Sequence, residues 1–430
     1  MGMERERLIF HIDVNSAFLS WESVERLKKD PDALDLRTIP SAVGGDASKR
    51  HGIVLAKSTP AKAFGVTTGE PIARALQKCP SLTVVPSHFE IYTAYSRKLI
   101  HLLEDYTPDI EKFSIDEAFL DMTETIHLFG TPTETADAIR LRVREELGFT
   151  VNVGIAPNKL LAKMASDFQK PDRTHTLFRE EIPGKMWPLP IRELFLVGSS
   201  AQARMEAIGL HTIGDLAHCD PDVLRAQLGD KYSRTILDYA NGIDRDPVEP
   251  RAPANKGYGN RITLSRDVSD MAEARQVLLS LAETVGARLR ADQVLCSQVC
   301  VELKDWRFRS FSHQGLLQFP TDSTSVIYEE ACRLLKEFWD GTPVRLIGVR
   351  AGKISGHEFV QMSLFETEQD RKRLKMEQAV DAIRSRFGTD SVKRASFLKK
   401  DSLVDHAASK HKHLGKRMEN SDDKNSGISH

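Results

Sequence analysis

Apolar positions in the N-terminal part of the chain change between strand and helix periodicity in a regular order. The apolar, β-prone run at residues 8–14 predicts a strand, and the spacing after it predicts a helix. Residues 31–87 are rich in glycine and proline, which predicts a small subdomain of short elements and turns. The next expected elements are a helix from Phe89, a strand pair within 110–122, a helix at 133–147, a strand at 149–156 and a helix after Asn158. This order predicts a split βαβ sheet with an inserted subdomain.

The C-terminal part repeats this order of elements on a smaller scale. Short helices are expected at 186–240, followed by a linker rich in Pro, Asn and Gly at 244–257. The elements expected beyond it are a strand at 258–266, a helix with the apolar face Leu278, Leu281, Val285 and Leu289, strands at 294–303 and 306–313, a helix at 325–338 and a strand at 344–352. They make a second βαββαβ unit, so the predicted fold class is α+β. The last 25 or so residues are too polar to fold, which predicts a disordered end.

Composition narrows the class of protein. At about 150 residues per domain, 430 residues argue for about three domains. With 40% hydrophobic and 28% charged residues, the chain is typical of globular proteins. No apolar stretch reaches the roughly 18 residues of a membrane span, and the N-terminus lacks the apolar core of a signal peptide. Five cysteines without metal-type pairing favour a reducing compartment, so we predict a cytoplasmic protein with no membrane partner.

The net charge of −1 hides an uneven distribution. Residues 391–430 hold nine Lys or Arg and five Asp or Glu, so this tail is +4 and the rest of the chain is −5. Phosphate contacts depend on local clusters of charge, so a nearly neutral chain can still bind nucleic acid. Net charge therefore leaves the question of nucleic-acid binding open.

Three carboxylates are expected to converge on one part of the first sheet. Asp13 ends the first strand, and Asp116 and Glu117 lie in the strand pair expected beside it. Such a trio is repulsive unless a cation lies among its members, and oxygen ligands without His or Cys favour Mg²⁺ or Mn²⁺. Neighbours in a regular strand face opposite sides, so Asp116 and Glu117 can share a metal only at a turn, bulge or edge. The alternative is that the acidic pair marks a solvated hairpin.

Five separated blocks carry a resemblance to a known family. They are IDVNSAF (12–18), GIVLAKSTPAKAFGV (52–66), SIDEAFLD (114–121), GIAPNKLLAKMASDFQKP (154–171) and IGLHTIGDLA (208–217). In this order and spacing they resemble the Y-family DNA polymerases of the DNA polymerase IV branch, over residues 6–400. The resemblance implies a right-hand polymerase with a ferredoxin-like βαββαβ palm (1–16 and 86–171), small fingers (17–85), a helical thumb with a helix-hairpin-helix-like block (172–243), a linker (244–257), a little finger (258–355) and a tail (356–430).

The resemblance also implies a catalytic centre. Asp13, Asp116 and Glu117 match the family's catalytic, metal-binding carboxylates, and the backbone carbonyl of Val14 matches its further metal ligand. Two Mg²⁺ ions, for which Mn²⁺ can substitute, would activate the primer 3′-hydroxyl and stabilise the leaving pyrophosphate. Glu117 would position the ion at the 3′-hydroxyl, and the two aspartates would bridge both ions. Phe18 matches the steric gate that rejects a ribose 2′-hydroxyl; the alternative is an ordinary core phenylalanine.

A second set of matching residues concerns the nucleotide. The segment with Ser58 and Thr59, together with Lys62 and Lys170, matches the family's nucleotide-binding residues. The family commonly has Tyr and Arg at the positions of Thr59 and Lys62, so this chain lacks a ring and a bidentate guanidinium there. Lys57 lies close by in sequence and is expected to supply compensating charge. The alternative for isolated lysines is a solvated surface.

Contacts with DNA are expected in two places. The thumb block resembles a helix-hairpin-helix whose turn, with Gly198, offers backbone N–H groups to a phosphate. Leu196 and Ser200 depart from the family pattern, and the alternative is a plain helical bundle. In the segment 306–314, aromatic residues alternate with arginines. One face of this strand is expected to pack, while Arg307 and Arg309 on the other follow phosphates. The alternative is that both arginines are solvated.

The polar tail contains a short motif of its own. Residues 361–365, QMSLF, resemble a sliding-clamp-binding peptide in which Gln361 fills a polar pocket and Leu364 and Phe365 fill an apolar one. The alternative is a segment that packs against the little finger.

The sequence therefore predicts a template-directed DNA polymerase that adds deoxynucleotides to a primer 3′ end. The resemblance implies low-fidelity translesion synthesis in DNA repair and damage tolerance, without proofreading. The expected partners are primer-template DNA, deoxynucleoside triphosphates and a sliding clamp, with the protein itself a monomer. One alternative is a clamp-associated protein that binds DNA ends with impaired synthesis, suggested by Thr59, Lys62 and Leu196. Another is a nucleotide cyclase with a palm-like sheet.

Overall fold

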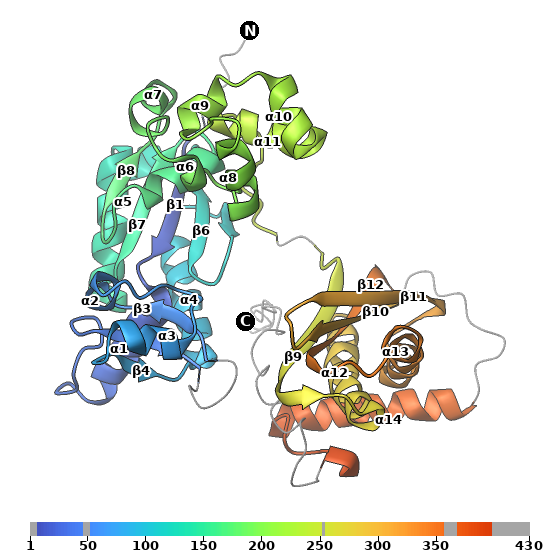
Figure 1. Cartoon of the computed structure of the whole chain (residues 1–430). Coiled ribbons are helices and arrows are strands. Elements are labelled where there is room, and N and C mark those ends of the chain that lie inside the picture. Colours follow the sequence, from blue (N-terminus) through green and yellow to red (C-terminus); the bar gives the residue numbers. More distant parts are fainter. Residues whose placement is uncertain (1–6, 46–51, 252–253, 357–367, 398–430) are drawn as a thin grey trace, which may run out of the picture. The chain divides into compact units, whose positions relative to one another are not determined.

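The computed structural model describes residues 7–45, 52–251, 254–356 and 368–397. The described residues up to 251 form one compact unit, called unit 1, and those from 254 onward form unit 2 (Figure 1). The motif at 361–365 with Gln361, Leu364 and Phe365 lies outside the described residues, as does the end expected to be disordered. In the described part of the chain, no helix is both long and apolar enough to cross a membrane.

A five-stranded sheet forms the centre of unit 1. Its strand order is β5 (Ile110–Lys112), β6 (Glu117–Asp121), β1 (Ile9–Val14), β7 (Val151–Ala156) and β8 (Thr174–Thr176). β1 runs antiparallel to both β6 and β7, and every residue of β1 and β7 is buried. The sheet has the split βαβ arrangement expected from the sequence, and the strand pair expected within 110–122 is β5 and β6.

The two faces of β1 contact different layers. Phe10, Ile12 and Val14 belong to a core shared with α4 (Phe89–Leu103) and α5 (Pro132–Arg142). His11 on the other face contacts α6 (Lys159–Asp167), which packs on β1 and β7. The predicted helix at 133–147 is α5 continued by the π-helical turn η2 (Val143–Leu147). It ends at Gly148, whose φ of 83° suits a residue without a side chain.

Short elements make up the rest of unit 1, as expected. The segment after β1 contains α1 (Ala17–Lys29), a three-stranded sheet in the order β3 (Val54–Lys57), β2 (Ser41–Gly44) and β4 (Thr83–Val85), and the helices α2 (Thr59–Ala63) and α3 (Ile72–Lys78). η1 (Ile126–Leu128) precedes α5. The helices after β8 are η3 (Arg179–Glu181), α7 (Ile182–Lys185), η4 (Ile191–Glu193), α8 (Ser199–Glu206), α9 (Ile213–Ala217), α10 (Pro221–Leu228) and α11 (Asp230–Ala240). Palm, fingers and thumb boundaries within unit 1 stay predictions.

Unit 2 is an antiparallel sheet with helices on it. The strand order is β11 (Ser310–Thr321), β10 (Val294–Asp305), β12 (Val344–Gly356) and β9 (Gly257–Val268), and α12 (Met271–Ala291) and α13 (Thr324–Phe338) share its core. The order of elements is the expected βαββαβ. The strand predicted at 306–313 is wrong at its start, because residues 306–309 form the turn between β10 and β11.

The last long helix of the described residues is α14 (Glu368–Phe387), and η6 (Ala395–Phe397) follows it. The carboxylate of Glu377, only 4% exposed, accepts hydrogen bonds from the N–H groups of Thr324 and Ser325 at the start of α13. Arg290 of α12 donates to the same carboxylate at 2.9 Å. Both buried charges are thereby paired and hydrogen-bonded, which attaches α14 to the helical layer of unit 2.

The approach of α6 to β7 provides a test of the fold. A Cβ atom on Gly154 would lie 1.9 Å from the carbonyl oxygen of Ala162 and 2.6 Å from the nitrogen of Ser166. We predict that Gly154→Ala lowers the stability of unit 1 by about 1–3 kcal/mol or more, because the backbone of α6 must move. Scanning calorimetry of the unit 1 transition measures this. Gly184→Ala, where a Cβ meets nothing within 4 Å, is the matched control and should leave the transition nearly unchanged.

Candidate active site

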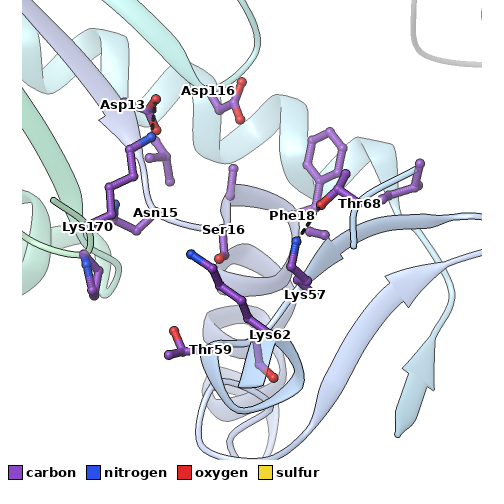
Figure 2. A pocket seen from close by; sticks show the side chains of 16 residues that line it. Asp13, Asn15, Ser16, Phe18, Lys57, Thr59, Lys62, Thr68, Asp116 and Lys170 are labelled. Atoms are coloured by element: carbon purple, nitrogen blue, oxygen red, sulfur yellow. Dashed lines mark hydrogen bonds and ion pairs between the residues drawn. The ribbon is translucent and has the colours of Figure 1, made fainter. Parts of the chain in front are cut away.

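A pocket of about 340 Å³ lies in unit 1 where the central sheet, α1 and the β3–α2 segment meet (Figure 2). Its lining is Asp13, Val14, Asn15, Ser16, Ala17, Phe18, Leu55, Ala56, Lys57, Ser58, Thr59, Lys62, Thr68, Asp116, Lys170 and Pro171. These include every residue predicted to bind metal or nucleotide except Glu117. Segments more than 150 residues apart in the chain thus supply one cavity of mixed charge.

Asp13 lies at the end of β1, directly opposite Glu117 of β6 in the antiparallel pair. Its carboxylate is 11% exposed and accepts from Lys170 Nζ at 2.8 Å. Burial raises the pKa of Asp13 to about 6, although the charge of Lys170 opposes the shift. For Lys170, burial alone would lower the pKa, but the carboxylates of Asp13 and Asp167 raise it above its ordinary value. The buried acid is therefore matched to a specific cation.

Asp116 reaches the same pocket because it lies in the turn before β6. β6 begins at Glu117, so Asp116 lies outside the strand. The rule that neighbouring side chains in a strand face opposite sides therefore does not apply to this pair. The turn is fixed by the N–H of Val14, which donates to the Asp116 carbonyl at 3.1 Å, and by the Ser114 hydroxyl, which donates to Asp116 Oδ1 at 2.6 Å. The sequence had required a turn, bulge or edge at this position, and the structure has a turn.

Glu117 has different partners from the two aspartates. Lys163 of α6 donates to its Oε2 at 2.9 Å, and His11 Nε2 lies 3.8 Å from the same oxygen. Burial by itself would raise the pKa of Glu117, but the neighbouring imidazole and the charge of Lys163 lower it to about 2. His11 is fully buried, which lowers its own pKa, and its Nδ1 lies 2.8 Å from Ser166 Oγ. Glu117 is thus charged and held by α6.

The donor atoms in the pocket suit a hard divalent cation. Carboxylate oxygens of Asp13 and Asp116 line it together with Val14, while His and Cys are absent from its lining. No group of three or more His, Cys, Asp or Glu side chains among the described residues is arranged to hold a metal. Two lysines neutralise Asp13 and Glu117 instead. The residue types fit a divalent cation, and its binding requires Lys170 to leave Asp13.

The ring of Phe18 is held rigidly at the pocket wall. It stacks on Tyr92 with ring centroids 4.5 Å apart and an angle of 11° between planes, and Phe89 meets it edge-on at 5.7 Å. The Tyr92 hydroxyl is fixed in turn by the carboxylate of Glu22 at 2.5 Å. Phe18 therefore packs against other aromatic rings and also lines the pocket. Its role as a steric gate stays a prediction.

Three lysines and a helix N-terminus make the other side of the pocket cationic. Lys57 donates to Thr68 Oγ1 at 3.2 Å, and burial together with the charge of Lys62 lowers the pKa of Lys57. Figure 2 shows Lys62 pointing toward Ser16 at the start of α1. No acidic residue lies in the first turn of α1, so its positive dipole end is left for an anion. The hydroxyl of Ser58 caps α2 and donates to the Ile39 carbonyl, so it is already engaged.

The segment that carries Lys170 is positioned by two buried asparagines, which the sequence analysis did not identify. The amide of Asn15 donates to Asn152 Oδ1 at 3.1 Å and accepts from the N–H of Asp172 at 2.9 Å. Asn152 donates to the carbonyls of Ser166 and Gln169 at 2.9 and 2.7 Å. The signal was present in the sequence, since polar residues alternate with apolar ones at the end of the first strand.

The residues predicted to contact DNA lie elsewhere. Gly198 is the N-cap of α8 in unit 1, and Leu196 beside it has a φ of 72° and accepts from the Tyr232 hydroxyl. Arg307 and Arg309 lie in the turn of unit 2, so the expected alternation of packed rings and exposed arginines along a strand is wrong. The aromatic rings are exposed because the turn, unlike a strand of the sheet, has no side that packs on the core.

Two family models match the chain. The model described as the impB/mucB/samB family matches residues 12–167, which contain the whole set of predicted carboxylates, and the model of that family's C-terminal domain matches residues 255–364.

Relatives match over almost the full chain. DNA polymerase IV of Clostridium acetobutylicum is 41% identical over 92% of this chain and 99% of its own length. DNA polymerase IV of Acetivibrio thermocellus is 36% identical over 93% of this chain and 99% of its own length. DNA polymerase IV 1 of Bacillus subtilis is 36% identical over 92% of this chain and 94% of its own length. The solved structure of a Y-family DNA polymerase chimera superposes with a TM-score of 0.70 at 26% identity, covering 81% of this chain and 99% of that one. The chain therefore belongs to the Y-family DNA polymerases, the impB/mucB/samB family, in the DNA polymerase IV branch.

Proposed function

We propose that this DNA-directed DNA polymerase extends a primer 3′ end across damaged templates in the pocket formed by Asp13, Asp116 and Lys170. Family membership supports the activity and its translesion character. The observation that supports the location is the meeting of two carboxylates, three lysines and the ring of Phe18 in one cavity. Neither the DNA-end-binding alternative nor the cyclase is favoured by these comparisons.

Members of this family use divalent metal ions, and we propose two Mg²⁺ ions, with Mn²⁺ able to substitute. Asp13, Asp116, Glu117 and the Val14 carbonyl would hold them, which requires Glu117 to leave Lys163 and Asp13 to leave Lys170. Such ions supply Lewis acidity to the primer 3′-hydroxyl and to the leaving pyrophosphate. The chain's own part is to keep its carboxylates ionised and side by side, and the salt bridges to the two lysines do this in the free protein.

In this proposal the triphosphate is bound mainly by the charged ammonium groups of lysines. Lys57, Lys62 and Lys170 line the pocket together with the first residues of α1, so phosphate oxygens would meet ammonium groups and backbone N–H groups together. A lysine gives charge without the paired hydrogen bonds of an arginine fork. Lys57 supplies part of the charge where Thr59 and Lys62 replace the family's usual residues. Ser58 contributes by capping α2, which holds Thr59 and Lys62 in place.

Several expected partners go beyond the pocket. Primer-template DNA is the substrate that the activity requires, and Gly198, Arg307 and Arg309 stay predicted contacts to it. The clamp-binding role of Gln361, Leu364 and Phe365, the monomeric state and the cytoplasmic location stay predictions as well.

Asp116→Asn tests the metal and catalytic assignment. We expect incorporation of deoxynucleotides to fall by about 100-fold or more, because a fully charged oxygen ligand is lost. Primer extension on undamaged template with Mg²⁺ measures the rate, and an anisotropy titration with primer-template measures binding, which should not change. Asp109→Asn, an exposed acid near β5, is the matched control. Wild-type rates for Asp116→Asn would exclude this site.

Phe18→Ala tests the sugar gate. The rigid ring at the pocket wall leaves room for a deoxyribose but collides with a 2′-hydroxyl, so its removal should raise the relative efficiency of ribonucleotide incorporation about tenfold or more. Single-nucleotide extension with matched ribo- and deoxyribonucleoside triphosphates measures the ratio. Phe18→Tyr keeps the ring and should keep the discrimination. An unchanged ratio in the alanine variant would move the gate to another residue.

Lys170→Met tests the charge pairing in the metal-free protein. Removing the cation takes away the interaction that favours ionised Asp13, so the pKa of Asp13 should rise above about 6. The folded value exceeds the ordinary value of 3.8, so the stability contributed by protonated Asp13 is present below pH 3.8 and is lost as pH rises through about 6. Carbon-13 NMR of labelled aspartate measures the titration, with Asp13→Asn for assignment and Lys62→Met as control. An unchanged midpoint would contradict the pairing.

A further inference from the structure

The turn between β10 and β11 is a rigid structure pinned by one buried acid. Asp305 is 1% exposed, and its carboxylate accepts from the N–H of Arg309 at 2.9 Å and from Arg309 Nε at 2.8 Å. The N–H of Trp306 donates to the Pro343 carbonyl at 3.2 Å, and the N–H of Phe308 donates to the Asp305 carbonyl at 3.0 Å. These contacts tie the tip to the start of β12, so its side chains are held in fixed directions.

Two large rings are exposed on this turn. Trp306 is 49% exposed and Phe308 is 64% exposed, and Phe308 adopts a φ of 66° that a bulky residue rarely takes. An arginine lies over each ring: Arg307 at 4.6 Å from the Trp306 centroid and Arg345 at 3.9 Å from the Phe308 centroid. The backbone therefore holds both rings out of the core of unit 2, and an arginine side chain lies over each of them. We call Trp306, Arg307, Phe308 and Arg345 the ring–arginine cluster.

The charge around the rings selects an anionic partner. Arg307, Arg309 and Arg345 lie at the turn, while the carboxylate of Asp305 is buried and engaged by Arg309. Exposed aromatic rings are stacking surfaces for nucleobases, and neighbouring arginines meet the phosphates between them. Another exposed ring in unit 2, Phe387 with Arg386 over it, is a single pair on α14 and forms no such cluster.

We infer that the ring–arginine cluster binds unpaired bases of single-stranded DNA, in the template strand that this polymerase copies. The inference rests on the proposed function for the source of that strand. Bases within a duplex stack on each other and present only their edges, so flat rings gain little from duplex DNA. In a single strand each base offers a free face to Trp306 or Phe308. A template held here would be gripped without regard to sequence, since every base has such a face.

Equilibrium binding to a single strand provides the test. The full chain is titrated against a fluorescein-labelled oligodeoxythymidine without nucleotides or primer. The double variant Trp306→Ala with Phe308→Ala should bind about tenfold or more weakly, because stacking on two rings is lost. Trp306→Phe with Phe308→Tyr keeps the rings and should keep the affinity. In the wild type, stacking should quench the fluorescence of Trp306, and Trp306→Phe should lose that change.

Four further measurements decide how the single-strand result is interpreted. Blunt duplex DNA should bind the wild type and the alanine variant equally, and Phe387→Ala should leave single-strand affinity unchanged. Equal single-strand affinity in the alanine variant and the wild type would overturn the inference, and so would an equal loss on duplex DNA, which indicates plain phosphate contacts. Loss of sliding-clamp binding with single-strand affinity unchanged would instead assign the cluster to a protein partner. Primer extension by the wild type, run in parallel, separates failure of this inference from failure of the proposed activity.

Discussion

The site depends on holding like charges side by side in a buried sheet. Pairing of β1 with β6 sets Asp13 directly opposite Glu117, and the turn before β6 adds Asp116. Burial raises the pKa of Asp13 and the charge of Glu117 adds to this rise, so this pair of acids would destabilise the sheet if it had no counter-charges. In the free protein α6 and the segment after it provide them, Lys163 for Glu117 and Lys170 for Asp13. The strand pairing that builds the site therefore requires α6 to lie where it does.

The position of α6 follows from small and polar residues on the sheet rather than from apolar packing alone. Gly154 lets the helix backbone approach β7 closely, and His11 contacts Ser166 across the same interface. Asn15 and Asn152 then fix the chain beyond the helix by hydrogen bonds to its backbone. Buried polar groups cost stability unless they are bonded, and His11 Nδ1, Asn15 and Asn152 have such partners. His11 Nε2 has no hydrogen bond and lies 3.8 Å from Glu117 Oε2. The geometry of the lysines is thus set by the sheet's own polar residues.

The sequence was informative where a local pattern decides the structure. Apolar runs with acids at their ends located β1 and β6, and the glycine- and proline-rich stretch marked the short elements between them. The turn at 306–309 could not be read in this way, because Trp306 and Phe308 favour strands and the segment lacks glycine, proline and asparagine. The turn is held by the buried carboxylate of Asp305, which accepts from Arg309, and by the N–H of Trp306, which donates to the carbonyl of Pro343. The burial of Asp305 and the contact with Pro343 depend on tertiary structure. The pairing of Glu117 with Lys163, 46 residues away, is likewise invisible to any local pattern.

Lys170 links the free and the substrate-bound protein through a balance of charge. In the free protein it is shared by Asp13 and Asp167, and it lines the pocket with Lys57 and Lys62. If Asp13 held a divalent cation, its carboxylate would no longer need Lys170, and the Lys170 ammonium would be available to the phosphates of the nucleotide. The hydrogen bonds of Asn15 and Asn152 hold the backbone of this segment, so only the side chain has to change partner. A lysine suits this exchange because its single point charge can leave a carboxylate for a phosphate without breaking a bidentate pair.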